Sequence, residues 1–355
     1  KNYIHYDVII IGAGPGGLFA ALRLVERGIP CRLFERGSRA EERIKGINRF
    51  WRYGEIDSRN NVCFGEGGAG LYSDGKLITR IKSPHIPYVL NRLVQFGAPD
   101  EIQYLANPHV GSDRIRRLIP KIREYLISHG CEMHFDTQVT EILTASTNTS
   151  ATGSVANTNT GTGASSSSSK KNVIGVRTEH GEVFHSSHVI VATGHSADDM
   201  LHHLQEIDVF LEGKSFAMGL RIEHPQKSLN QIQYREYSES SSLGAANYKL
   251  AYTDPDTSIG TYSFCMCPGG YVLNATTSPN LTICNGMSNY NRNSPFGNAA
   301  IVVSIDHDKM FGAKNIFGGL KYRTDLETRA YQAATGSPID STSYKISNAS
   351  DQQQP

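Results

Sequence analysis

The sequence carries two separate glycine-rich segments whose spacing indicates binding of a phosphate-containing ligand. The first, residues 7–24, reads DVIIIGAGPGGLFAALRL and holds Gly12, Gly14 and Gly17 in a G-x-G-x-x-G arrangement. Glycine at these positions permits a tight turn, a close approach of backbone to a pyrophosphate, and close packing of the following helix. The start of that helix offers free N–H groups and a partial positive charge to phosphate oxygens.

The elements around this first segment are those of a βαβ unit. Residues 6–11 form an apolar, β-branched run typical of a buried parallel strand, and an amphipathic helical pattern follows. A second strand, residues 31–34, leads to Glu35, whose carboxylate can accept hydrogen bonds from ribose hydroxyls. Because an acid at this position disfavours a 2′-phosphate, the pattern predicts FAD or NAD as the ligand rather than NADP.

The second segment, residues 63–77, reads CFGEGGAGLYSDGKL. Its glycines allow backbone to lie flat against a large planar ligand, while Ser73, Asp74 and Lys76 offer polar groups at the ligand's edge. A surface loop with no ligand is the alternative that glycines alone leave open. Residues 35–82 do not continue as the next βαβ unit of a simple NAD domain, which favours FAD.

Several further segments resemble a widespread family of FAD-dependent dehydrogenases, flavoproteins of the glutathione-reductase and fumarate-reductase type found in bacteria and plastid-bearing eukaryotes. The resemblance runs from Tyr6 to Val303 and is carried by DVIIIGAGPGGLFAAL, NVCFGEGGAGLYSDGKLITRIK, VIVATGHSADD, FAMGLRIEHPQ, YSFCMCPGG and NGMSNYNRN. It implies an FAD-dependent oxidoreductase in which the first glycine loop holds the pyrophosphate and the second lies along the ribityl chain and flavin ring. It implies no particular substrate.

The resemblance and the motifs together predict a set of cofactor-binding residues. In the resembling proteins the backbone at Val139 binds the adenine ring, and an A-T-G element ending at Gly194 lies near the pyrophosphate. Ordinary strand or turn positions are the alternative for both. The full set is Gly12, Gly14, Pro15, Gly16, Gly17, Glu35, Arg36, Arg43, Gly65, Gly67, Gly68, Gly70, Ser73, Asp74, Val139, Thr193 and Gly194.

We expect an α/β fold with a Rossmann-like FAD-binding domain, three layers around a mostly parallel sheet, and an inserted α+β substrate domain. The FAD-binding domain is expected at residues 1–143 and 173–205, and the substrate or cap domain at 206–330. Residues 144–172 are of low complexity, and we expect a disordered insert in a hairpin. The resembling proteins carry a late glycine-acid motif that we do not find after Val303, so residues 331–355 are expected to be a truncated end of the FAD-binding domain.

Four residues of the second half are candidates for contact with a substrate: Arg221, His224, Cys265 and Cys267. The guanidinium of Arg221 can bind a carboxylate with two hydrogen bonds, and the favoured alternative is a structural ion pair with Glu223 or another acid. His195 is a candidate acid or base, or a structural histidine. The pattern assigns no catalytic residue and no metal ligand.

The two cysteines lie in GTYSFCMCPGG, which reads as a strand. In a regular strand Phe264 and Met266 face the core, while Cys265 and Cys267 face a cavity. Their Cα atoms would stand about 6.7 Å apart with parallel side chains, which disfavours a disulfide and favours packed thiols.

Composition limits which kinds of binding partner and which cellular compartment are expected. The 35 basic and 34 acidic residues give a net charge of +1, which offers no support for nucleic-acid binding. We expect no membrane span, and the six scattered cysteines favour a reducing intracellular compartment, either the cytoplasm or an organelle such as a plastid. The expected partner is a small-molecule substrate, with NAD(P)H as a candidate electron donor and the oligomeric state left open. The alternatives are an NAD-dependent reductase and a truncated, non-catalytic nucleotide-binding protein.

Overall fold

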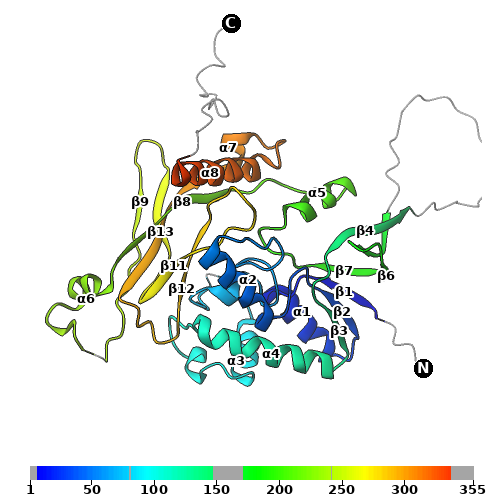
Figure 1. Ribbon diagram of the computed structural model, residues 1–355, viewed down its shortest axis with the longest axis horizontal. Helices are drawn as coiled ribbons and strands as arrows, with labels where there is room; N and C mark the ends of the chain where they lie inside the picture. The colour runs from blue at the N-terminus through cyan, green and yellow to red at the C-terminus, as the bar shows by residue number, and fades with distance from the viewer. Residues whose placement is uncertain (1–5, 80, 147–170, 241, 337–355) are drawn as a thin grey trace, which may run out of the picture.

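The computed structural model describes residues 6–79, 81–146, 171–240 and 242–336 (Figure 1). The parts of the chain at 147–170 and 337–355, which include most of the predicted insert and most of the predicted tail, lie outside the described residues. A parallel sheet of order β3-β2-β1-β7 forms the centre of the N-terminal half. Its strands are β1 (Val8–Ile11), β2 (Cys31–Phe34), β3 (Cys131–His134) and β7 (His188–Val191).

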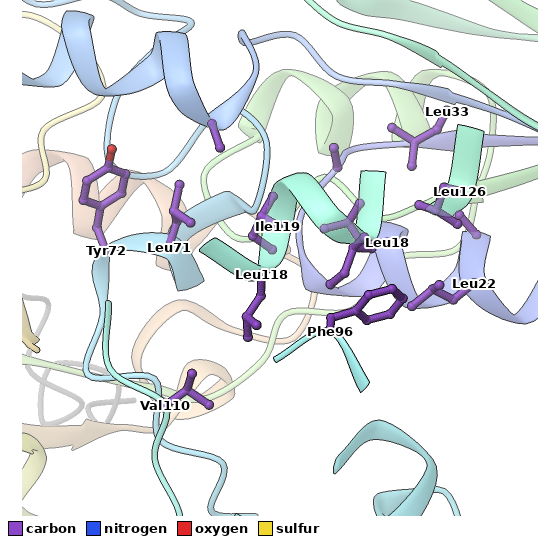
Figure 2. Packing of buried hydrophobic residues seen from close by; sticks show 14 of the residues in the cluster. Leu18, Leu22, Leu33, Leu71, Tyr72, Phe96, Val110, Leu118, Ile119 and Leu126 are labelled. Atoms are coloured by element: carbon purple, nitrogen blue, oxygen red, sulfur yellow. The ribbon is translucent and has the colours of Figure 1, made fainter. Parts of the chain in front are cut away.

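Each face of this sheet packs against a different layer, because neighbouring strand residues point to opposite sides. Ile10 of β1 belongs to a buried cluster with helices, whereas Ile9 and Ile11 belong to a second cluster with an antiparallel sheet. Figure 2 shows the helical side, where Leu18 of α1 and Leu126 of α4 belong to the same buried cluster. The predicted α/β class with a three-layer, parallel-sheet domain is therefore confirmed.

Helices and a small antiparallel sheet complete the layers in the described part of this half. The helices are α1 (Pro15–Val25), α2 (Ala40–Tyr53), α3 (Ile86–Gln95), α4 (Ser112–Ser128) and α5 (Asp198–Glu206), and the antiparallel sheet contains β4 (Val139–Ser146), β5 (Lys171–Thr178) and β6 (Val183–His185). Ser146 and Lys171, which flank the low-complexity segment, are paired across β4 and β5. Among the described residues, no helix combines the length and apolar character needed to cross a membrane.

The second half contains a separate antiparallel sheet of order β8-β13-β10-β9, which lies beside the parallel-sheet domain (Figure 1). These strands are β8 (Phe216–Pro225), β9 (Ala251–Thr253), β10 (Gly260–Cys267) and β13 (Phe296–Ile305). The hairpin β11 (Gly270–Asn274) with β12 (Cys284–Ser288) and the helices α6 (Gln226–Tyr234), α7 (His307–Phe311) and α8 (Gly318–Thr335) complete it. This combination is the α+β arrangement expected for this part of the chain.

One expectation for this half is wrong, namely the regular alternation along β10. The strand pairs Phe264 with Ala300 and Cys267 with Asn298, so two residues of β10 stand opposite one residue of β13. This is a β-bulge, which breaks the period of two. As a result Phe264 is 61% exposed while Met266 is 6% exposed, although a regular strand places both on one face.

Candidate nucleotide-binding site

A cavity of about 390 Å³ lies at the carboxyl ends of β1, β2 and β7. Parallel α/β sheets bind ligands at this edge, where the strand order reverses, and here the reversal falls between β1 and β7. The volume lies within the range of small-molecule sites. Its lining residues are Ile11, Gly12, Gly14, Pro15, Gly16, Phe34, Glu35, Arg36, Cys63, Phe64, Gly68, Ala69, Gly70, Thr137, Gln138, Val139, Ala192, Thr193, Gly194, His195, Ser196 and Met200.

Two glycines of the first loop are required by close backbone contacts. Gly12 has a φ of +106°, and a Cβ atom on it would stand 2.4 Å from the carbonyl oxygen of Ala192, which follows β7. A Cβ atom on Gly17 would stand 1.8 Å from the carbonyl oxygen of Gly12. Gly12 therefore permits the turn beside β7, and Gly17 lets α1 pack onto the end of β1.

The N-terminus of α1 faces this cavity without a side-chain cap. Gly14 is the N-cap residue and supplies no side-chain hydrogen bond, and Pro15 occupies the first turn. Gly14, Pro15 and Gly16 all line the cavity. This eleven-residue helix thus directs backbone N–H groups and the positive end of its dipole into the cavity. Bulky side chains are absent from this part of the cavity wall, which suits a diphosphate.

The carboxylate of Glu35 lies at the end of β2 and connects the two glycine loops. Its Oε2 accepts a hydrogen bond of 2.8 Å from Ala13 N, and its Oε1 accepts bonds of 3.0 Å from both Gly37 N and Gly65 N. The residue is only 6% exposed but still lines the cavity. The sequence pattern predicted that Glu35 binds a ribose hydroxyl. It could not predict which backbone N–H groups donate to the Glu35 carboxylate.

Arg43 is fully buried and shapes the second glycine loop from behind. Its guanidinium donates to the carbonyl oxygens of Asn61, Val62, Glu66 and Gly68 at 2.7 to 2.9 Å. Burial lowers the pKa of Arg43 to about 10, so it remains protonated at neutral pH. The described cavity lining does not include Arg43, and its contacts are with the loop backbone.

Ser73 and Asp74 belong to the second glycine-rich segment but lie outside the described cavity lining. Asp74 is 1% exposed and forms ion pairs with Arg292 at 2.6 Å and Lys76 at 3.1 Å. Burial opposes ionisation of Asp74, but the hydrogen bond from Arg292 and the charge of Lys76 outweigh it and lower its pKa. Ser73 Oγ donates to Gly70 O at 2.9 Å, which closes the short 3₁₀ helix at Gly68–Tyr72.

The remaining predicted cofactor residues divide between the cavity and its supporting loops. Gly68, Gly70, Val139, Thr193, Gly194 and Arg36 line the cavity, whereas Gly17, Gly65 and Gly67 are outside its described lining. Arg36 lies 4.5 Å from the ring centre of Phe64 and pairs with Asp199 at 2.8 Å. The N–H of Gly67 donates to Ala13 O at 2.8 Å, so the backbones of the two glycine loops are joined directly.

Several lining residues were not predicted from the sequence, and four of them could have been found. Thr137 and Gln138 immediately precede Val139, and Cys63 and Phe64 are the first two residues of the second glycine-rich segment, so proximity along the chain was a usable signal. His195 also lines the cavity, where burial and the charge of Arg323 lower its pKa.

The four substrate candidates lie on β8 and β10, outside the described lining of this cavity. Arg221 donates to Asn298 Oδ1 at 2.6 Å and to Cys265 O at 3.2 Å. The ring of His224 lies 5.6 Å from that of Tyr248. Lys76, near the end of the second glycine-rich segment, donates to Met266 O and thereby joins this segment to β10.

Comparison with protein-family models gives two matches that agree with this geometry. Residues 5–48 match the model described as an FAD binding domain. Residues 215–353 match the model described as an FAD-dependent protein, C-terminal domain-like. Both matched models describe FAD proteins, and they cover separate parts of this chain. Its cofactor is therefore FAD, and the cavity between the two glycine loops has the backbone lining and helix end that the ADP part of FAD requires.

Individual proteins are similar to this chain over different lengths. An uncharacterized protein of Clostridium beijerinckii is 34% identical over 328 residues, which is 92% of this chain and 57% of the relative. The chain therefore spans little more than half of that relative. A digeranylgeranylglycerophospholipid reductase of Methanosarcina acetivorans is 28% identical over 97 residues, 25% of this chain and 24% of the relative. The crystal structure of THI4 from Thermovibrio ammonificans has a TM-score of 0.35 at 17% identity, over 58% of this chain and 64% of that one.

Proposed function

We propose that this FAD-dependent protein is an oxidoreductase that moves a hydride or electron pair between the flavin N5 atom and a small molecule. The observation that carries the proposal is the cavity at the ends of β1, β2 and β7, bounded by both glycine loops. When bound, FAD supplies the redox chemistry, and the protein supplies position and electrostatics. The matches to two FAD-protein families support the oxidoreductase class.

Different residues of the chain bind different parts of such a cofactor. The uncapped start of α1 offers N–H groups to the diphosphate, and Glu35 offers its remaining acceptor position to a ribose hydroxyl. Val139 and Gln138 line the cavity where the adenine ring is expected, and Gly68 to Gly70 offer a flat wall beside Gly14. We assign no catalytic base, since none of these groups is placed against a substrate.

The proposal is tested first by the visible spectrum of the purified chain, before and after incubation with FAD. We expect flavin absorbance near one equivalent per chain, with quenched flavin fluorescence, and no comparable uptake of NAD. A chain that remains colourless after incubation with FAD contradicts the proposal and favours the non-catalytic alternative. Anaerobic addition of NADH or NADPH to the yellow protein then shows whether a nicotinamide reduces it, as loss of the flavin bands.

A further inference from the structure

Two cysteines lie at the bulge of β10. In the sequence they are far from all the glycines assigned to the FAD site. Cys265 and Cys267 are separated by Met266, and Cys265 has a φ of +48°, in the left-handed region that residues with a Cβ atom seldom adopt. This conformation and the bulge remove the parallel side-chain arrangement expected of a regular strand. Cys267 Sγ donates to Cys265 O at 3.3 Å, so the thiol of Cys267 lies against the backbone of Cys265.

The two sulfur atoms have different surroundings. Cys267 is fully buried, whereas Cys265 is partly exposed to solvent. Two cations flank the bulge, since Arg221 donates to Cys265 O and Lys76 donates to Met266 O. The negative charge of Asp74, which is paired with Lys76 at 3.1 Å, contributes to the raised pKa of Cys267. The hydrogen bond from Cys267, followed by the charges of Lys76 and Arg221, lowers the pKa of Cys265 to about 5, while the same hydrogen bond and burial raise that of Cys267.

We propose that Cys265 and Cys267 form a redox-active dithiol, in which Cys265 attacks disulfides and Cys267 resolves the product. The inference rests on the β10 bulge and its two cations, and not on the proposed flavin chemistry. The substrate class is a low-molecular-weight disulfide, written RSSR. A partly exposed thiolate next to a buried thiol is the arrangement that thiol–disulfide exchange requires.

The exchange proceeds in two balanced steps. The Cys265 thiolate attacks one sulfur of RSSR, so a Cys265–S–S–R bond forms and one RS⁻ leaves. Cys267 then loses its proton and attacks the Cys265 sulfur, so the Cys265–Cys267 bond forms and the second RS⁻ leaves. Two protein thiols are oxidised, RSSR is reduced, and the two protons end on two RSH molecules.

A second pair of neighbouring thiols in the molecule provides an internal comparison. Cys31 and Cys131 are paired across β2 and β3 and are 0% and 3% exposed. They lie in the main hydrophobic cluster, where a disulfide reagent has no access. We therefore expect Cys31 and Cys131 to stay reduced under conditions that oxidise the β10 pair.

The test uses glutathione disulfide as the probe and mass spectrometry of tryptic peptides as the readout. Trypsin releases residues 250–292 as one peptide, which also contains the exposed Cys284, so the experiment is done in a Cys284→Ser chain. We expect this peptide to lose two hydrogen atoms and to carry no glutathione. A peptide that stays fully reduced, or one that retains glutathione on Cys265, overturns the proposal.

Two further variants separate a reactive pair from two packed thiols. In Cys267→Ser, the glutathione adduct on Cys265 is expected to accumulate, whereas Cys265→Ser is expected to leave Cys267 unmodified. Circular dichroism of both variants verifies that they fold. At pH 6 we expect Cys265 to react with glutathione disulfide roughly tenfold faster than Cys284 does in the unmutated chain, because a low thiolate pKa outweighs the accompanying loss of nucleophilicity. Equal or slower reaction of Cys265 contradicts the proposal.

Discussion

The backbone N–H of Gly65 donates a 3.0 Å hydrogen bond to Oε1 of Glu35, across thirty residues of sequence. The same carboxylate accepts from Ala13 through Oε2, so a single buried side chain holds both glycine loops in place. A carboxylate offers about four acceptor positions, and Gly37 occupies a third one. One position therefore remains for a ribose hydroxyl, and Glu35 combines a structural role with a ligand-binding one.

Replacing Glu35 with Gln is expected to weaken both the fold and cofactor binding. The amide has one acceptor oxygen, and its NH₂ group would face a backbone N–H that has lost its partner. We expect a loss of about 2 kcal/mol in the free energy of unfolding and at least roughly a tenfold loss of FAD affinity. Urea unfolding and fluorescence titration with FAD measure the two effects.

Glu42→Gln is the matched control for this variant, because Glu42 is exposed on α2. It removes the same charge without removing a buried acceptor, so both quantities should stay close to those of the unmutated chain. Equal behaviour of the two variants would show that Glu35 contributes only charge.

Arg43→Lys is expected to disturb the second glycine loop despite the conserved charge. A lysine ammonium has three donors at one point and cannot reach the carbonyl oxygens that the planar guanidinium reaches. We expect a loss of about 3 kcal/mol in unfolding free energy, because buried carbonyl groups lose their donors. Arg49→Lys on the same helix has a side chain that is 65% exposed and should be neutral. Comparable losses in both variants contradict this assignment.

The sequence predicted those features whose residues are close to one another along the chain. The glycine spacing, the apolar strand before it and the acid at the end of the second strand occupy one continuous stretch, so the βαβ unit and its cavity could be predicted. The backbone contacts of Glu35 depend on Gly65, which reaches it only after folding. Arg43 reads as one of several basic residues on an amphipathic helix, so nothing local distinguishes it from exposed Arg49.

The β10 bulge could not be predicted for the same reason. A bulge is defined by the partner strand, and β13 lies about thirty residues further along the chain. Local alternation predicted one common face for Cys265 and Cys267, and only the pairing with Asn298 and Ala300 shows the extra residue.

Comparison of Gly12→Ala with Gly28→Ala separates the effect of the close contact between residue 12 and Ala192 O from the effect of a positive φ alone. Both glycines have positive φ, +106° for Gly12 and +71° for Gly28, but a Cβ atom on Gly28 has no neighbour within 4 Å. Gly28→Ala is expected to cost about 1 kcal/mol of unfolding free energy with FAD affinity unchanged. Gly12→Ala adds an overlap with Ala192 O and should cost about 3 kcal/mol or more, with loss of FAD binding. Retained FAD affinity in Gly12→Ala argues against this turn as the diphosphate site.

Asp74 contributes stability that depends on pH in a defined direction. Its folded-state pKa is lowered by Arg292 and Lys76 against the opposing effect of burial, so its contribution is fully present above the unfolded-state value of about 3.9. That contribution is lost as the pH falls through the lower folded-state pKa. Asp74→Asn leaves two cations without their partner, and we expect a loss of about 2 kcal/mol at pH 7 after allowance for their partial exposure.

Urea unfolding between pH 3 and pH 7 separates this effect from a general loss of packing. The difference in unfolding free energy between the unmutated chain and Asp74→Asn should be constant from pH 7 to about pH 5 and should shrink below about pH 4. Asp256→Asn, at an exposed position, should follow the unmutated chain throughout. A difference that persists unchanged at pH 3 would mean that Asp74 acts through its shape, because protonation removes the charge but leaves the side chain in place.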